Sequence, residues 1–274
     1  MPTRSFRLPR PLRPVRLSRS ATLGLCAVPV AALLVVALLV PLPFTVARPG
    51  PTANVLGGRD GQQVVDISGA PVRETEGELR MAAIAATAPD VRHGLGDLLD
   101  GWFRTDRTVM PTDAVYPGGG SVREAERYNL REMEKSQHTA VDAALAYLKR
   151  DPERVKVTLD LAGIGGPSAG LPLALGIVDK LDGDGSGGEL TGGRSVAATG
   201  TIAADGTVGP ISGAALKAQA VARDGARVFL VPESNCAEAR AELPRGLRLV
   251  PVSTLDGAVE ALRALKGGGR VARC

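Results

Sequence analysis

Residues 159–175, LDLAGIGGPSAGLPLAL, join an apolar run typical of a strand to an apolar run typical of a helix through a glycine-rich turn. Glycines surround Ser168 in this turn, so the backbone can bend sharply and approach a bound molecule closely. Pro167 suits the first turn of a helix, where its missing N–H costs nothing. The stretch predicts a nucleophile at Ser168, with an ordinary strand-to-helix connection as the alternative.

The same turn would also supply hydrogen-bond donors. The backbone amides at the start of a helix lack partners within the helix and can stabilise a developing negative charge. We therefore expect the turn and oxyanion site to comprise Gly166, Pro167, Ala169 and Gly170.

Strand and helix patterns alternate on both sides of this turn. The pattern predicts an α/β (α+β) domain with a mixed sheet and packed helices over residues 151–266, followed by a flexible tail at 267–274. The expected strands are 155–161, 196–202, 227–231 and 247–252, and the expected helices are 169–181, 214–223, 236–242 and 255–265. Asp205-Gly206 is a hairpin signal between them.

The region before this domain is less regular. Residues 48–120 are expected to form a small unit with strands near 63–67 and 79–84, closed by a glycine joint at 118–120. Ser121 and Glu124 form a capping box, which predicts a long helix over 121–150.

The N-terminus combines basic and apolar segments. The chain has a net charge of +4, but six arginines precede residue 20, so the rest carries 27 basic against 29 acidic groups. Only 3% of the residues are aromatic, and nucleic-acid binding is therefore disfavoured. Residues 23–47 carry no charge and predict a transmembrane anchor, with residues 1–22 as a basic cytoplasmic tail and the catalytic part outside the cytoplasm. A cleaved signal peptide is the alternative.

Two further patterns concern covalent and metal chemistry. In an oxidising compartment Cys236 and Cys274 could form a disulfide, since Cys26 lies in the apolar segment. The loop that begins at Asp182 imitates the first half of a calcium loop, but Gly193 stands where the bidentate acid should be. We expect no metal and no cofactor.

The base for Ser168 follows by elimination. Both histidines precede Ser168, which disfavours the chain order of an α/β-hydrolase and leaves other orders of a catalytic triad open, and no serine has a lysine three residues later. Among the six lysines, Lys180 is twelve helical positions from Ser168, about 18 Å away. Lys217 lies in an alanine-rich helix, where burial would lower its pKa and allow it to act as a base.

Three motifs resemble the proteolytic domain of Lon proteases, which are Ser-Lys dyad serine peptidases. They are GPSAG at 166–170, ATGTI at 198–202 and GTVGPISGAALK at 206–217. The resemblance implies that Ser168 is the nucleophile, that Lys217 is the base and that Thr199 holds the lysine amine by a hydrogen bond. Ser212 departs from the family pattern, which has glycine there.

The front of the chain resembles bacterial membrane-anchored Lon-like proteases. Those usually carry a PDZ domain before the catalytic strand, but no room for one exists between Leu148 and Val155. No Gly-Lys pair occurs, so a Walker A loop is absent. Related catalytic domains form rings, so the resemblance allows a homo-oligomeric ring.

Together these observations predict a membrane-anchored, ATP-independent serine endopeptidase that cleaves flexible or unfolded protein substrates. Two alternatives stay open. One is a non-catalytic membrane-anchored binding or scaffold module with a Lon-like fold, and the other is an esterase or amidase with the same dyad.

Overall fold

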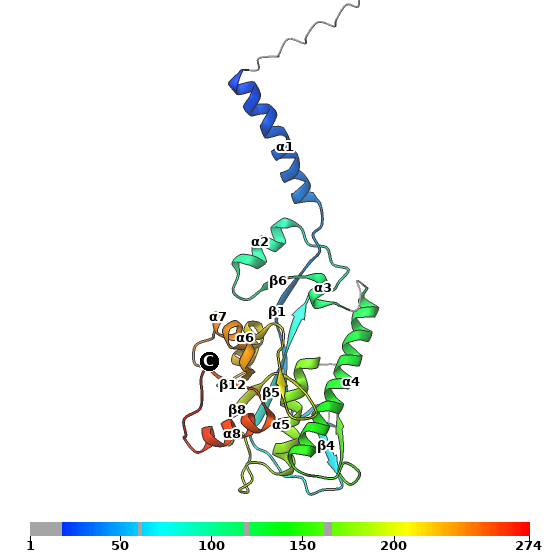
Figure 1. The fold of residues 1–274 in the computed structure, drawn as a ribbon, viewed down its shortest axis with the longest axis vertical. Helices are drawn as coiled ribbons and strands as arrows, with labels where there is room; N and C mark the ends of the chain where they lie inside the picture. Colours follow the sequence, from blue (N-terminus) through cyan, green and yellow to red (C-terminus); the bar gives the residue numbers. More distant parts are fainter. Residues whose placement is uncertain (1–17, 60–61, 118–120, 162–165) are drawn as a thin grey trace, which may run out of the picture.

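The computed structural model describes residues 18–59, 62–117, 121–161 and 166–274 (Figure 1). Most of the predicted basic tail lies outside these residues, as do the glycine joint at 118–120 and Gly165, which precedes the serine turn.

A six-stranded mixed sheet organises the body of the molecule. Its strands, in spatial order, are β12 (Arg248–Val252), β11 (Val228–Pro232), β8 (Ser195–Ala198), β5 (Glu78–Ala86), β1 (Phe44–Asn54) and β6 (Thr108–Pro111). The first four run parallel to one another, whereas β1 is antiparallel to both β5 and β6. The mixed α/β class predicted from the sequence is confirmed.

Helices cover both faces of the sheet. One core cluster contains residues of α4 (Val122–Tyr147), α5 (Gly170–Leu181) and α8 (Leu255–Lys266), and the other contains residues of α6 (Ala214–Arg223) and α7 (Cys236–Ala241). Strand β11 shows why both faces are covered, because Val228 and Leu230 join the first cluster while Phe229 and Val231 join the second. Every residue of α5 is buried, so this helix occupies the centre of its layer.

The sheet does not stop at the expected catalytic region. Strands β1, β5 and β6 come from residues 44–111, and β5 pairs directly with β8. The region expected as a small unit over 48–120 therefore shares a sheet with the segment expected as the proteolytic domain. A bulge between Pro49 and Thr52 lets β1 accommodate its prolines without breaking the ladder.

Short ladders complete the fold. They pair β2 (Gly58–Arg59) with β3 (Gln62–Gln63), β4 (Val65–Ser68) with β7 (Lys156–Leu159), and β9 (Thr201–Ile202) with β10 (Val208–Gly209). The expected strand 155–161 is β7, which pairs with β4 instead of entering the central sheet. The expected strand 196–202 is divided into β8 and β9, and two helices that the sequence did not predict are α2 (Leu95–Phe103) and α3 (Thr112–Val115).

The N-terminal helix α1 (Arg19–Leu39) projects away from the body (Figure 1). Residues 19–36 have a mean hydropathy of 1.9, and none of this window is buried within the structure. Among the described residues this is the one helix long and apolar enough to cross a membrane, a test that a signal sequence also passes. The helix ends earlier than the expected segment 23–47, because residues 44–47 begin β1 and Thr45 and Ala47 are buried there.

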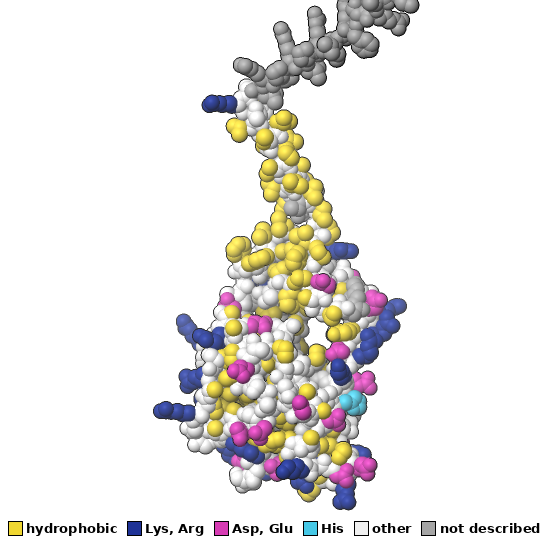
Figure 2. All heavy atoms as spheres, in the orientation of Figure 1, with side chains coloured by type: hydrophobic (Ala, Val, Ile, Leu, Met, Phe, Trp, Pro, Cys, Tyr) yellow, Lys and Arg dark blue, Asp and Glu magenta, His cyan; other side chains and the backbone are white. Residues whose placement is uncertain are grey.

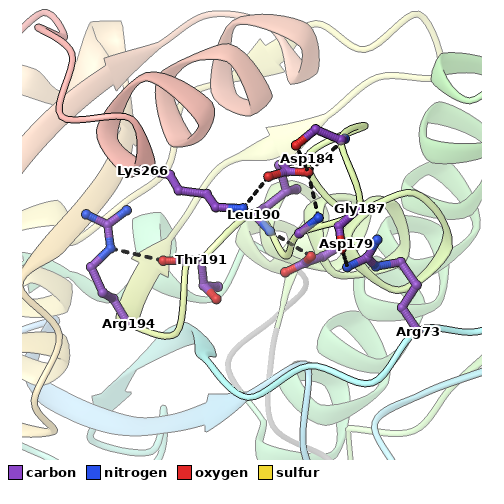
Figure 3. A network of polar contacts seen from close by, with 10 residues as sticks. Arg73, Asp179, Asp184, Gly187, Leu190, Thr191, Arg194 and Lys266 are labelled. Carbon is purple, nitrogen blue, oxygen red and sulfur yellow. Dashed lines mark hydrogen bonds and ion pairs between the residues drawn. The ribbon is translucent and has the colours of Figure 1, made fainter.

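The loop that imitates a calcium site is held together by polar contacts of Asp184 (Figure 3). Asp184 accepts hydrogen bonds from the amides of Ser186 and Gly188 and from the Ser186 hydroxyl, and it also pairs with the Lys266 ammonium from α8. A cation of the protein thus faces Asp184 from the end of the last helix. Among the described residues no group of three His, Cys, Asp or Glu side chains is arranged to hold a metal.

A disulfide joins Cys236 to Cys274, with a Cα–Cα distance of 5.2 Å. The tail expected to be flexible is therefore attached to the first residue of α7. Arg248 adds a second connection, because its guanidinium donates to the Val271 carbonyl oxygen at 3.3 Å.

We expect Cys274→Ser to destabilise the protein. The crosslink joins residues 38 positions apart and so restricts the unfolded chain. In the chain-entropy model, its removal lowers the free energy of unfolding by about 4 kcal/mol. Chemical denaturation without reductant should show a lower midpoint, and reductant should lower the wild-type midpoint to a similar value. Cys26→Ser is the matched control, and an unchanged midpoint for Cys274→Ser would contradict the prediction.

Candidate active site

Ser168 lies in the short 3₁₀ turn Pro167–Ala169 that leads directly into α5. The carbonyl groups of this turn are held from two sides. Ser136 on α4 donates its hydroxyl proton to the Pro167 carbonyl oxygen at 3.2 Å, and the Gly200 amide donates to the Ser168 carbonyl oxygen at 3.0 Å. A long helix and the end of β8 therefore fix the position of the serine.

At Gly170, the start of α5 lies very close to β9. A Cβ atom at this position would lie 2.9 Å from the Ile202 side chain and 3.0 Å from its amide nitrogen. The second glycine of the GPSAG motif is thus required by packing at the start of α5.

Lys217 reaches the serine from the other face of the sheet. It lies one turn into α6, and its Nζ donates a hydrogen bond to the Ser168 Oγ at 2.6 Å. The side chain is 3% exposed, with the small residues Ala214 and Ala218 buried beside it on the same helix. The structure therefore brings together the two residues that the sequence predicted as nucleophile and base.

Burial changes the protonation of this lysine. Desolvation lowers the pKa of Lys217 from 10.5 to about 8, because the charged ammonium loses its hydration. The negative charge of Glu238 partly opposes this effect and raises the pKa of the amine. The lysine can thus exchange a proton near neutral pH, which a solvated lysine does not do.

The turn before α6 depends on Gly213. This residue caps the helix in the left-handed region with φ of 72°, and a Cβ atom would lie 2.8 Å from the Ile84 side chain. Ser212, the departure from the family pattern, is exposed and is not among the described residues with positive φ. The glycine that the turn requires is therefore retained.

Two polar residues that the sequence analysis missed hold this turn in place. Asn235 accepts a hydrogen bond from the Ile211 amide at 2.9 Å and donates one to the Ile211 carbonyl oxygen at 2.8 Å. Glu238 accepts a hydrogen bond from the Ala214 amide at 2.8 Å and so caps α6 from a neighbouring helix. Their only signal in the sequence is a pair of polar side chains soon after the buried strand β11.

Thr199 lies beside the serine turn, but it makes a different contact from the one that the resemblance implies. Its hydroxyl is fully buried and donates to the Ser168 carbonyl oxygen at 3.4 Å. Among the described residues, no hydrogen bond joins this hydroxyl to the Lys217 amine. Thr199 thus fixes the backbone of the serine turn.

Two backbone amides of the serine turn already donate hydrogen bonds within the protein. The Ala169 amide donates to the Gly166 carbonyl oxygen at 3.0 Å, and the Gly170 amide donates to the Pro167 carbonyl oxygen. The Ser168 amide has no acceptor within the part of the chain that the structure describes. The Ser168 amide is not among the expected oxyanion donors, but it is better placed to receive a negative charge than the amides of Ala169 and Gly170, which already have acceptors.

A cleft of about 620 Å³ opens beside the Ser168 and Lys217 side chains. The second half of β5, residues 82–86, and the segment before α6, residues 210–212, both line it. Tyr116 and Asn129 extend the lining from other parts of the chain. The cleft is large enough for several residues of an extended peptide.

The other candidate bases lie away from this cleft. Lys180 is buried at the far end of α5, where its amine donates to the Val65 carbonyl oxygen at 2.9 Å. His138 is exposed on α4, and His93 is buried against Thr87, with 2.9 Å between the ring Nε2 and the hydroxyl. The elimination that led from Ser168 to Lys217 agrees with these positions.

Known proteins resemble this chain in the part that contains Ser168 and Lys217. The family model of the Lon protease (S16) C-terminal proteolytic domain matches residues 131–264. The Lon protease of Azospirillum brasilense is 34% identical over 139 residues, which are 50% of this chain and 16% of that protein. The archaeal Lon protease of Methanothermobacter thermautotrophicus is 33% identical over 110 residues, covering 39% of this chain and 16% of that protein.

A third relative, the Lon protease of Azorhizobium caulinodans, is 39% identical over 95 residues, covering 33% of this chain and 10% of that protein. The matched part of this chain thus spans a sixth or less of the length of each of these relatives. The matched residues include Ser168, Thr199 and Lys217. Residues 131–264, which hold the serine turn and the buried lysine, therefore match the Lon protease (S16) C-terminal proteolytic domain.

Proposed function

We propose that this protein is a membrane-anchored, ATP-independent serine endopeptidase that uses a Ser168–Lys217 dyad on flexible or unfolded protein substrates. The observation that carries the proposal is the 2.6 Å hydrogen bond between a buried lysine amine and a serine hydroxyl oxygen at the side of an open cleft. The match to the proteolytic domain family supports peptide hydrolysis as the reaction.

The proton transfers follow from the burial of the lysine. A group of pKa about 8 is neutral in about a tenth of the molecules at pH 7. Neutral Lys217 accepts the proton of the Ser168 hydroxyl as the Oγ attacks the peptide carbonyl carbon, and the Ser168 amide stabilises the oxyanion. The ammonium then gives its proton to the leaving amine, and water hydrolyses the acyl-enzyme with Lys217 again as the base.

Substrate binding would use the free edge of β5. Strand β8 pairs with β5 only at residues 78–80, and among the described residues no strand pairs with the rest of β5 on that side. The Thr87 amide donates to the Val46 carbonyl oxygen on β1, and since successive residues of a strand alternate, the amides of Ile84 and Ala86 face the cleft. An extended segment could add to this edge as a further strand, which a folded substrate could not do.

The membrane anchor and the ATP independence in this proposal are inferred from sequence features. Helix α1 is long and apolar enough to span a bilayer, and the arginines before it favour a cytoplasmic N-terminus with the dyad on the opposite side. The sequence contains no Gly-Lys pair and therefore no Walker A loop. A peptidase that acts without ATP cleaves segments that are already extended, so flexible segments are the substrates in this proposal.

Removal of either dyad residue should abolish turnover. We expect Ser168→Ala and Lys217→Met each to lower kcat/KM on an unstructured protein such as casein by about 10⁴-fold or more. Lys217→Met keeps the volume of the side chain and removes a buried charge, so its thermal stability should not fall. Ser253→Ala and Lys135→Ala, both at exposed positions, are the controls.

The result also tests the alternative of a non-catalytic module. Wild-type protein without turnover and without labelling of Ser168 by a serine-reactive probe would contradict the peptidase. Activity that survives in either dyad variant would contradict the dyad.

The pH profile should report the lysine. We expect kcat/KM to rise with pH and to level off above an apparent pKa of about 8, because the base acts only when deprotonated. Glu238→Gln removes the charge that raises the pKa of Lys217, so the rising limb should move to lower pH. Glu242→Gln, just beyond the end of the same helix, is the matched control. A limb that stays in place in Glu238→Gln would rule out this electrostatic assignment.

The proposed strand pairing has its own test. Ala86→Pro removes an amide that faces the cleft and spares the ladder with β1, so the fold should be retained. We expect a several-fold lower kcat/KM on peptides that extend on both sides of the cleaved bond, with unchanged turnover of a small ester. Ala86→Ser keeps the amide and should behave as wild type. Equal losses on peptide and ester would show that the substitution disturbs the dyad instead.

A further inference from the structure

Helix α2 has two apolar faces, and the protein covers only one of them. Leu98 is buried, and Gly101 packs where a Cβ atom would lie 2.9 Å from the Val109 side chain. On the other face, Leu99 is 47% exposed, Trp102 is 75% exposed and Phe103 is 84% exposed. These three residues have the spacing i, i+3 and i+4, so they form one continuous stripe on the helix surface.

This stripe lies beside the helix that could span a membrane. Helix α1 ends at Leu39, and three residues later the Leu42 amide donates to the His93 carbonyl oxygen at 3.0 Å. His93 is two residues before the start of α2, and α1 and α2 are in contact. Figure 2 shows hydrophobic side chains gathered at the end of the body where α1 leaves it, next to the apolar surface of α1 itself.

Two acidic side chains near the stripe form ion pairs with arginines. Asp100 forms an ion pair with Arg107 at 2.8 Å, and Asp106 forms one with Arg104 at 2.9 Å. Asp100 and Asp106 therefore each have an arginine beside them, which reduces their repulsion from anionic headgroups, whereas Asp97 accepts a hydrogen bond from the Gly94 amide at 3.2 Å. Tryptophan favours the boundary between headgroups and acyl chains, where one end of the ring is wet and the other is apolar.

We propose that α2 is an interfacial helix, which inserts Leu99, Trp102 and Phe103 into the surface of the same bilayer that α1 spans. The proposal rests on the membrane anchor of the proposed function. The occupant of this face is lipid, because the stripe is continuous with α1 and lies within a few residues of the point where α1 ends. The helix would give the body a second attachment and so fix the orientation of the cleft relative to the membrane.

The chain carries its own probe, since Trp102 is its only tryptophan. The full-length protein should be reconstituted into phosphatidylcholine vesicles. We expect a blue-shifted Trp102 emission, strong quenching by lipids brominated near the headgroup, weaker quenching by lipids brominated near the chain end, and protection from aqueous acrylamide. Leu99→Gln combined with Phe103→Gln should reduce the bromolipid quenching, whereas Leu130→Gln at an exposed position on α4 should not.

Two other outcomes would overturn the proposal. Quenching by acrylamide and not by bromolipid would place the stripe in water. Protection from both quenchers would show that protein covers it, as in contact with a second copy of the chain. Alkaline carbonate extraction separates these failures from failure of the anchor, because a protein without a spanning helix leaves the vesicles, whereas an anchored protein with a free α2 stays with them.

Discussion

The rest of the structure must hold Lys217 buried and within hydrogen-bond distance of Ser168. A pKa lowered from 10.5 to about 8 corresponds to about 3 kcal/mol lost from folding at neutral pH, because the folded state disfavours the ammonium that the unfolded chain keeps. The penalty is full below pH 8 and falls as the pH rises toward 10.5. The fully buried α5 and the well-packed strands supply the stability that offsets it.

The arrangement of layers explains how two distant segments meet. Helix α5 packs with α4 and α8 on one face of the sheet, whereas α6 packs with α7 on the other. The short strand β8 ends at Ala198, and beyond this end the Gly200 amide already contacts the serine turn. The Lys217 amine meets the Ser168 hydroxyl beside this turn, at 2.6 Å.

Much of this site could be predicted from the sequence, because the required residue types are few. Ser168 stands in a glycine turn, and elimination among two histidines and six lysines leads to Lys217. The roles of Asn235 and Glu238 could not be predicted, since hydrogen bonds between residues 24 apart depend on tertiary packing. Strand β1 was also missed, because its first residues continue the apolar run of α1 and its prolines and glycine imitate a loop. These residues enter the sheet through a bulge that only the pairing with β5 reveals.

The wall of the cleft has one more consequence. Four of the five residues at 82–86 are alanines, and only Ile84 among them has a larger side chain. Such a wall offers main-chain donors and acceptors but no deep, chemically distinct hollow for a substrate side chain. Recognition along this strand would therefore depend on the extended conformation of the bound segment more than on its side chains.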